Sequence, residues 1–228
     1  MPHVPHRKEL PQRAVDTVYD TLKQRILRNK LSGGSQLLED AVSADLGVSR
    51  TPIREALARL EAEGLIEAVP RHGYRVLPIT MDDMRDIYQV LSPLETVAAE
   101  LLAEKKPNTV EVKALQEAVD RMAAALKADD LDAWAEADET FHARLVDLCG
   151  NRRLAKVAHL LFAQSHRVRL FTLRLRDKPM SSVKNHAALV DAIRKGRPDL
   201  ARAVHAGQRT HWTDTMSQLL ERLNIHQL

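Results

Sequence analysis

The stretch Gly47-Val-Ser-Arg-Thr-Pro-Ile-Arg-Glu-Ala-Leu57 decides how the first part of this chain folds. Ser49 is a favoured helix N-cap and Pro52 suits the first helical turn, so we expect a helix to begin directly after Ser49. Its apolar residues recur at helical spacing and form one buried stripe: Ile53, Leu57 and Leu60. A short glycine-containing turn joins this helix to an expected helix over about 39–46, and the pair predicts a helix-turn-helix.

The segments on either side complete a small domain. Apolar residues at three- and four-residue steps predict a first helix over about 14–30. After the second helix of the pair, two short β-branched segments, Leu65–Val69 and Tyr74–Ile79, flank the turn Pro70-Arg-His-Gly73 and predict a hairpin, the only sheet that we expect. Three helices and a hairpin are typical of a winged helix-turn-helix.

The helix after Ser49 is the candidate DNA reader. With its apolar stripe facing the core, Arg50, Thr51 and Arg54 lie on the outer face or at the tip. Arginine suits guanine because its planar guanidinium donates two parallel hydrogen bonds. The hairpin tip, Arg71-His72-Gly73, adds a cation, a hydrogen-bonding ring and a glycine that permits close backbone approach. The alternative is a solvated basic face, but helix, turn and basic wing together favour DNA binding.

Beyond residue 80 the sequence predicts helices alone. They are expected over about 81–104, 109–127, 130–149, 152–176, 181–196 and 198–222. Six helices joined by short loops predict an antiparallel bundle. The expected fold is therefore mainly α, with a winged helix-turn-helix domain over residues 1–78 and an all-helical domain over residues 79–228.

Composition sets the class of protein. Of 228 residues, 44% are hydrophobic and 29% charged, which suits a chain with a full core. The single cysteine, Cys149, fits a reducing compartment, and the absence of a long apolar run or a secretory signal predicts a cytoplasmic protein without a membrane span. A net charge of +3 permits nucleic acid binding without arguing for it, and 4% aromatic residues disfavour base stacking on single strands.

These motifs resemble a known family. The string Gly47–Leu57, followed by Arg59-Leu-Glu-Ala-Glu-Gly-Leu65 and Arg71-His-Gly-Tyr-Arg-Val-Leu, is similar to the GntR family of bacterial transcription regulators. The resemblance covers most of residues 14–78 and implies a homodimer on a palindromic operator in double-stranded DNA. It places Arg50, Thr51 and Arg54 in the major groove and the wing, Arg71, His72 and Gly73, near the minor groove. Asp40 stands where some relatives have a basic DNA-contacting residue.

The helical part contains residues that suit a polar site. Asp138 and His142 are four residues apart, so both project from one helix face. His186 and Gln208 lie eleven residues on either side of Arg197, the centre of the last expected turn, which places them at one level of an antiparallel hairpin. The spacing permits these four groups to converge inside the bundle.

A second resemblance covers about residues 80–223. Asp138-Glu-Thr-Phe-His142, Cys149-Gly-Asn-Arg-Arg-Leu154 and His186–Gly196 are similar to the FCD ligand-binding domain of the GntR subfamily named after the fatty-acid regulator. That domain implies a helical bundle whose central cavity often holds zinc or nickel on one aspartate and three histidines, with small carboxylates as effectors. The matching positions here are Asp138, His142, His186 and Gln208.

Two departures from the family pattern affect this site. The amide of Gln208 replaces a histidine and is a poorer ligand, which leaves a weakened metal site and no metal site as alternatives. His205 and His211 lie three residues away and would compensate only with a shift of register. Leu91 stands where many relatives have an arginine that faces the effector, which predicts a less anionic effector.

Cations for an effector are expected in the stretch His166-Arg-Val-Arg169, at Arg167 or Arg169. The alternative is an exposed basic face that these residues share with Arg174 and Arg176. Trp134 sits on an apolar stripe and is expected in the core.

The function that these patterns favour is a ligand-responsive transcription regulator acting as a repressor. A small metabolite in the helical domain, a carboxylate by resemblance, would change the fit of paired winged heads to the operator. One alternative is a DNA-binding module whose helical domain only forms the dimer. The other is a metal-dependent enzyme using Asp138, His142 and His186, which we disfavour because the sequence offers no nucleophile–base pair.

Overall fold

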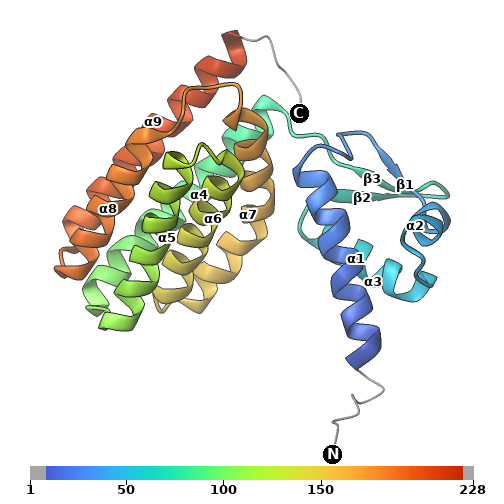
Figure 1. Cartoon of the computed structure of the whole chain (residues 1–228), viewed down its shortest axis with the longest axis horizontal. Helices are drawn as coiled ribbons and strands as arrows, with labels where there is room; N and C mark the ends of the chain where they lie inside the picture. The colour runs from blue at the N-terminus through green and yellow to red at the C-terminus, as the bar shows by residue number, and fades with distance from the viewer. Residues whose placement is uncertain (1–8, 223–228) are drawn as a thin grey trace, which may run out of the picture. The chain divides into compact units, whose positions relative to one another are not determined.

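The computed structural model describes residues 9–222, which form two compact units that divide between Ile79 and Thr80 (Figure 1). The N-terminal unit contains three helices and three strands, in the order α1 (Glu9–Leu27), β1 (Gln36–Leu37), α2 (Glu39–Leu46), α3 (Arg50–Ala62), β2 (Ile66–Val69) and β3 (Gly73–Val76). The helical unit contains α4 (Met81–Lys105), α5 (Thr109–Lys127), α6 (Leu131–Leu148), α7 (Arg152–Leu173), α8 (Met180–Arg194) and α9 (Pro198–Arg222).

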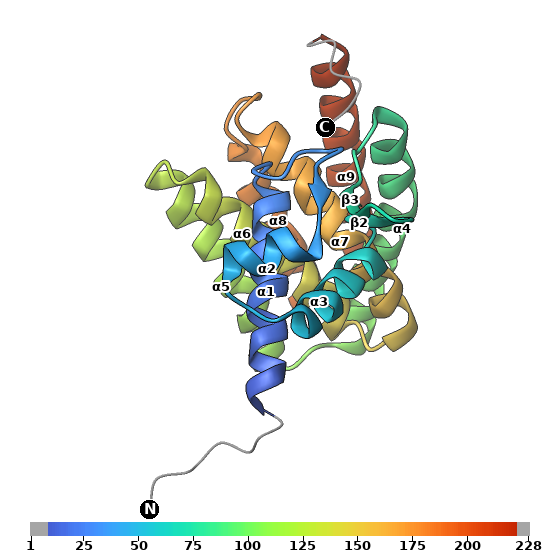
Figure 2. The ribbon, with the colours of Figure 1, turned by 90° about the vertical axis from the view of Figure 1, so that its right-hand side faces the viewer.

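The N-terminal unit packs α1 against α3, with α2 beside them (Figure 2). The apolar stripes of α1 and α3 build its core. They include Val18, Leu22, Ile26, Ile53 and Leu57, all of them 0–1% exposed. Gly47 ends α2 in the left-handed conformation, with φ at 65°, and so turns the chain into α3. The winged helix-turn-helix is confirmed.

The sheet has one strand more than the hairpin that the sequence predicts. The strands lie in the order β1–β3–β2, all antiparallel, with Gln36 opposite Arg75 and Leu37 opposite Tyr74. A strand of two residues is too short to give an alternating pattern, so the sequence contains no signal for β1. Because β1 is present, β3 of the wing is paired with a strand on each side, β1 on one and β2 on the other.

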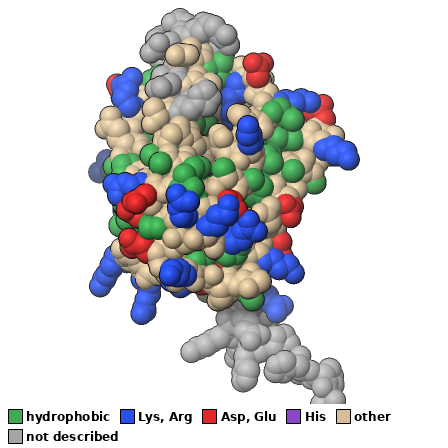
Figure 3. All heavy atoms as spheres, turned by 90° about the vertical axis from the view of Figure 1, so that its left-hand side faces the viewer, with side chains coloured by type: hydrophobic (Ala, Val, Ile, Leu, Met, Phe, Trp, Pro, Cys, Tyr) green, Lys and Arg blue, Asp and Glu red, His purple; other side chains and the backbone are tan. Residues whose placement is uncertain are grey.

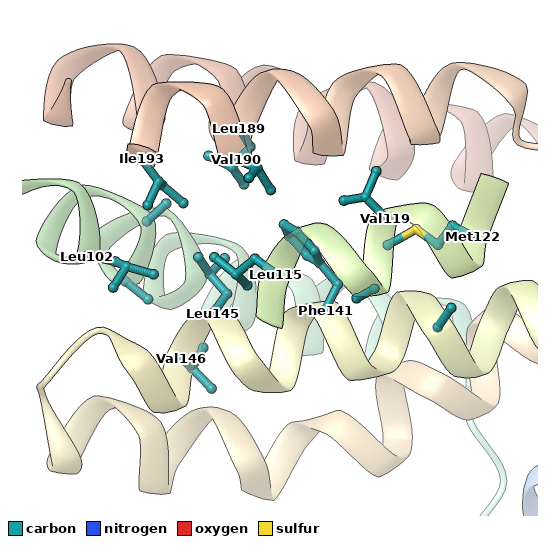
Figure 4. Packing of buried hydrophobic residues seen from close by; sticks show 14 of the residues in the cluster. Leu102, Leu115, Val119, Met122, Phe141, Leu145, Val146, Leu189, Val190 and Ile193 are labelled. Carbon is teal, nitrogen blue, oxygen red and sulfur yellow. The ribbon is translucent and has the colours of Figure 1, made fainter. Parts of the chain in front are cut away.

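The helical unit is built around apolar side chains from several helices. Figure 4 shows leucine, isoleucine and valine side chains of α4, α5, α6 and α8 meeting around the ring of Phe141. Side-chain caps fix where the helices begin: Thr80 and Asp83 form a capping box on α4, and Asn108 and Glu111 form another on α5. The predicted all-helical bundle is confirmed.

Most helix ends lie close to the expected positions, but two differences matter. The first helix begins at Glu9 and ends at Leu27, so the expected range of about 14–30 is displaced. The expected helix over 152–176 is wrong at its end, because α7 stops at Leu173 and Arg174 is its C-cap. Arg176 therefore lies in the turn before α8, not on a helix face.

Charges of both signs are spread over the face of the molecule in Figure 3, where several Lys and Arg side chains lie beside Asp or Glu. The ion pairs of the helical unit include Arg202–Glu100 and Lys195–Asp191. Within residues 9–222, every helix is too short or too polar to span a lipid bilayer.

Candidate DNA interface and effector site

The start of α3 presents the three expected DNA-reading residues to solvent. Arg50, Thr51 and Arg54 are all exposed, whereas Ile53 between them is fully buried. A helix anchored on its buried side with a basic tip is the geometry that enters a major groove.

Both reader arginines are held by acidic side chains of α2. Nη2 of Arg50 lies 2.6 Å from Oδ1 of Asp40, and Nε of Arg54 lies 2.7 and 2.9 Å from the carboxylate oxygens of Glu39. The side chains of Arg50 and Arg54 remain 61% and 63% exposed, so these are surface ion pairs that contribute little to stability. Asp40 and Glu39 therefore form an acidic edge directly beside the reader arginines.

The wing tip is exposed, and a hydrogen bond from Gln36 holds its backbone. Arg71 and His72 are exposed, and Nε2 of Gln36 donates a 2.8 Å hydrogen bond to the carbonyl of His72. Gly73 has φ of 74°, and a Cβ at this position would lie 2.5 Å from the carbonyl oxygen of Leu37. The close approach that this glycine permits is therefore to β1 of its own sheet, a structural reason that the sequence did not reveal.

In the helical unit the structure brings together Asp138, His142, His186 and Gln208 from α6, α8 and α9. Nε2 of His186 lies 3.3 Å from Nε2 of His142 and 3.4 Å from Oδ1 of Asp138, and Nε2 of His142 lies 3.8 Å from Oδ2 of Asp138. The amide nitrogen of Gln208 lies 3.3 Å from Nε2 of His186. Three of these residues are buried, and Gln208 is partly buried.

These distances suit a bound divalent ion. Donor atoms held at about 2.0–2.2 Å from one tetrahedral ion lie roughly 3.3–3.6 Å apart, close to the separations observed. Nδ1 of His186 donates to the carbonyl of Ser182 at 2.7 Å, which leaves the lone pair on Nε2. Nδ1 of His142 lies 3.0 Å from Oε1 of Glu95, and the other ring nitrogen, Nε2, faces His186 and Asp138. Asp138, His142 and His186 therefore fit a metal.

The sequence missed two residues of this site, Glu95 and Arg209. Glu95 on α4 is 0% exposed, and its carboxylate forms an ion pair with Arg209 on α9, which is 6% exposed. Nη2 of Arg209 also lies 3.0 Å from Nδ1 of His142. Glu95 lies on the same helix face as the buried residues Leu91 and Leu102. A charged residue on an otherwise apolar face was the sequence signal that could have identified Glu95 as part of a site.

His205 joins the same cluster on the side away from Asp138. Its Nδ1 lies 2.9 Å from Oγ1 of Thr96, and its Nε2 lies 3.8 Å from Oε2 of Glu95. His205 thus groups with Glu95 and His142 and does not replace Gln208 beside His186. The side chain of His211, the other histidine considered, lies outside the residues whose side chains the structure describes.

Burial and neighbouring charges set the protonation of this cluster. Burial lowers the pKa values of His142, His186 and His205 below the ordinary value, and the guanidinium of Arg209 lowers them further. Burial alone would raise the pKa of Asp138, but Arg169, 3.0 Å away, together with His142, His186 and Arg209, outweighs it, and that pKa lies well below its usual range. At neutral pH the cluster thus combines neutral imidazoles with an ionised carboxylate, the forms that ligate metals.

A cavity of about 80 Å³ adjoins this cluster. Its polar lining includes Asp138, His142, Arg169, Arg176, Gln208 and Arg209. Of the two arginines expected beside an effector, Arg169 lines the cavity. Arg167 is buried, but it is not among the described residues that line this space. Burial of both also excludes them from an exposed basic face.

A winged helix-turn-helix with an exposed basic tip, joined to a helical unit with a charged cavity, defines a class of DNA-binding transcription regulators. Residues 14–76 match the gntR family of bacterial regulatory proteins, and residues 86–222 match the FCD domain. The chain therefore belongs to the GntR family and carries an FCD domain.

Curated relatives agree with this assignment. An uncharacterised HTH-type transcriptional regulator of Agrobacterium vitis is 40% identical over 134 residues, covering 58% of this chain and 78% of the relative. A probable D-xylose utilization operon transcriptional repressor of Paenarthrobacter nicotinovorans is 30% identical, covering 81% and 80%. The gluconate operon transcriptional repressor of Bacillus subtilis is 27% identical, covering 81% and 77%. The family and these relatives are transcription regulators, not enzymes.

Solved structures share the fold at low sequence identity. Escherichia coli McbR/YncC aligns with a TM-score of 0.77 at 20% identity, covering 90% of this chain and 97% of the other. A putative GntR transcriptional regulator from Rhodococcus sp. RHA1 aligns with a TM-score of 0.72 at 20% identity, covering 91% and 97%.

Proposed function

We propose that this protein is a ligand-responsive repressor that binds a palindromic operator as a homodimer in the cytoplasm. The single observation that carries the proposal is the pairing, in one chain, of an exposed basic reader helix with a buried, charged cavity of about 80 Å³. Two relatives are named operon repressors, which supports repression as the mode of action.

In this proposal the N-terminal domain, residues 1–78, binds the operator. Arg50, Thr51 and Arg54 contact bases and phosphates in the major groove, because they are exposed at the leading end of α3. Arg71 and His72 contact the minor groove from the wing tip, with Gly73 shaping the turn that presents them. A homodimer follows from the two-fold symmetry of a palindromic site.

The helical domain, residues 79–228, binds the effector and forms the dimer. We propose that a small carboxylate enters the cavity beside Asp138 and Arg169. Asp138, His142 and His186 would hold zinc or nickel there, with the buried amide oxygen of Gln208, which has no hydrogen-bond partner in the part of the chain that the structure describes, as a weak fourth ligand. Such an ion, when bound, supplies positive charge for a carboxylate oxygen.

The main alternative is a helical domain that only forms the dimer. A bundle of that kind gains from a filled centre, since apolar packing stabilises more than buried charge does. Here Glu95, Asp138, Arg169 and Arg209 are all nearly inaccessible to solvent at the bundle centre. Because these buried charges cost stability, their presence favours a helical domain that binds a ligand over one that only forms the dimer.

Operator binding by the full-length protein tests the proposal. Fluorescence anisotropy with DNA from the protein's own promoter region, at low salt, is expected to show specific binding. Arg54→Ala should weaken it by roughly 1–3 kcal/mol. Arg85→Ala removes an exposed, ion-paired arginine from α4, the partner of Asp82, and should leave binding unchanged. A wild-type protein that ignores its own promoter would overturn the proposal.

A further inference from the structure

Arg176 differs from the cations on either side of it. Arg174 and Lys178 form surface ion pairs with Asp132 and Asp129. Arg176 instead lies with its guanidinium carbon 5.9 Å from the centre of the Trp134 ring and lines the cavity with it. The basic face that the sequence suggests for Arg174 and Arg176 is therefore wrong for Arg176, since α7 ends before it.

Three donor groups of Arg176 and Trp134 have no acceptor within the described part of the chain. Nε and Nη2 of Arg176, the edge of a guanidinium that binds a carboxylate in bidentate fashion, are both buried and without a hydrogen bond. The same holds for Nε1 of Trp134, whose side chain belongs to the core as expected and is 2% exposed. Buried donors without acceptors are costly, so three of them around one cavity indicate a missing ligand.

The pair lies at a defined distance from the metal-ligating cluster. Trp134, Asp138 and His142 occupy successive turns of α6, and four residues of helix rise about 6 Å. All three line the same cavity. A molecule of a few carbon atoms therefore has the length to reach from Asp138 to Trp134, the ring beside Arg176.

Charge balance distinguishes Arg176 from the other arginines of the cavity. Arg169 is paired with Asp138, and Arg209 is paired with Glu95. Arg176 has no carboxylate partner among the described residues, and burial, together with the nearby charge of Arg169, lowers its pKa. A ligand with one negative charge at the cluster would leave Arg176 without a counter-ion.

We propose that Arg176 and Trp134 form a second anion site and that the effector is a short-chain dicarboxylate. One carboxylate lies beside Asp138, His142 and Arg169, and the other accepts hydrogen bonds from Arg176 and Trp134. This inference rests on the proposed effector function and specifies its ligand. It reverses the expectation of a less anionic effector drawn from Leu91, which is fully buried in the apolar core, because Arg176 supplies a cation from another element.

Isothermal titration of the full-length, zinc-loaded protein tests the second anion site. The probes are unbranched dicarboxylates of two to six carbons and the monoamide of each. At least one dicarboxylate should bind ten or more times as tightly as its monoamide. Arg176→Gln should abolish that preference, and Arg176→Lys should restore part of it. Arg174→Gln, the matched surface control, should behave as the wild type.

The outcomes separate this inference from the proposed function. Equal affinity for a dicarboxylate and its monoamide overturns the second anion site, and so does a preference that survives in Arg176→Gln. In either case, a carboxylate that binds the protein and releases it from the operator would still support the proposed function as a ligand-responsive regulator. Failure of every dicarboxylate to bind also overturns it. Operator binding by the same preparation then decides separately whether the protein is a DNA-binding regulator.

Discussion

Nη2 of Arg50, at the first residue of α3, lies 2.6 Å from Oδ1 of Asp40 on α2. An acidic side chain thus contacts an arginine that we expect to contact DNA. Any phosphate or base that binds Arg50 must compete with this carboxylate and approach its negative charge.

Asp40→Asn is therefore expected to tighten DNA binding. Removing one like charge beside the phosphates is worth about 1 kcal/mol at low salt, roughly a fivefold gain in affinity. Because phosphate attraction does not depend on sequence, the gain should appear on random DNA as well as on the operator. Anisotropy titrations over a salt series measure both. Asp45→Asn, which removes the partner of Arg25, is the matched control. Weaker operator binding by Asp40→Asn would contradict this view and show that Asp40 orients Arg50.

Gly73→Ala is expected to destabilise the N-terminal unit more than Gly47→Ala. Both glycines have positive φ, at 74° and 65°, which costs an alanine about 1–2 kcal/mol. At Gly47 the added Cβ meets open space, whereas at Gly73 it meets the carbonyl oxygen of Leu37 at 2.5 Å. Urea denaturation followed by circular dichroism gives the comparison. Equal losses in the two variants would show that β1 can move away from β3 at little cost.

His142→Ala should abolish retention of zinc or nickel. This residue belongs to both groups of buried metal-ligating side chains, with Asp138 and His186 on one side and Glu95 and His205 on the other. Metal content after reconstitution and desalting is the measurement, and His159→Ala removes an exposed histidine as a control. An equally loaded His142→Ala protein, or a wild type that retains no metal, would refute the site.

The metal-free protein should lose stability as the pH falls below about 6.5. Folding lowers the pKa values of His142, His186 and His205 from 6.5, so the unfolded chain takes up protons that the folded chain excludes. The stabilisation is fully present above 6.5 and declines as the pH falls toward the folded pKa values. Asp138 adds to this loss only below 3.8, because its pKa is also lowered.

Urea midpoints between pH 7.5 and 5.5 measure this dependence. His205→Gln should flatten it, since the residue is buried and carries one of the three lowered pKa values. His159→Gln, which alters an exposed histidine, should leave it unchanged. A stability that is constant over this range in the wild type would mean that the three imidazoles are protonated equally in both states.

Much of the fold was accessible from local sequence patterns. Helix periodicity and glycines such as Gly47 act through neighbouring residues, and they predicted the helices and the wing. Ser49 occupies the expected N-cap position of α3, although its side chain makes no capping hydrogen bond within residues 9–222. Strand β1 could not be predicted, because its two residues gain their structure from pairing with β3. The end of α7 at Leu173 was also missed, since no proline or glycine marks it.

Only part of the candidate site could be predicted from the sequence, because some of its residues meet only through long-range packing. Asp138, His142 and His186 follow helical spacing and a family resemblance, and the structure brings them together. Glu95 and Arg209 satisfy each other across two helices that are far apart in sequence. Nothing local distinguishes Arg209 from a surface arginine of α9, and the inward turn of Arg176 depends on where α7 stops.

Helix α4 begins with a capping box at Thr80, where the two units divide, and continues without interruption past Glu95. Glu95 lies fifteen residues after Thr80, a rise of about 22 Å along a helix that also contains Pro93. Glu95 on α4 lies against His142 and Arg209. A ligand that moves these two side chains would therefore also move this part of α4. The other end of α4 leads directly to the N-terminal unit, so we expect a ligand in the cavity to act on the DNA-binding unit through this helix.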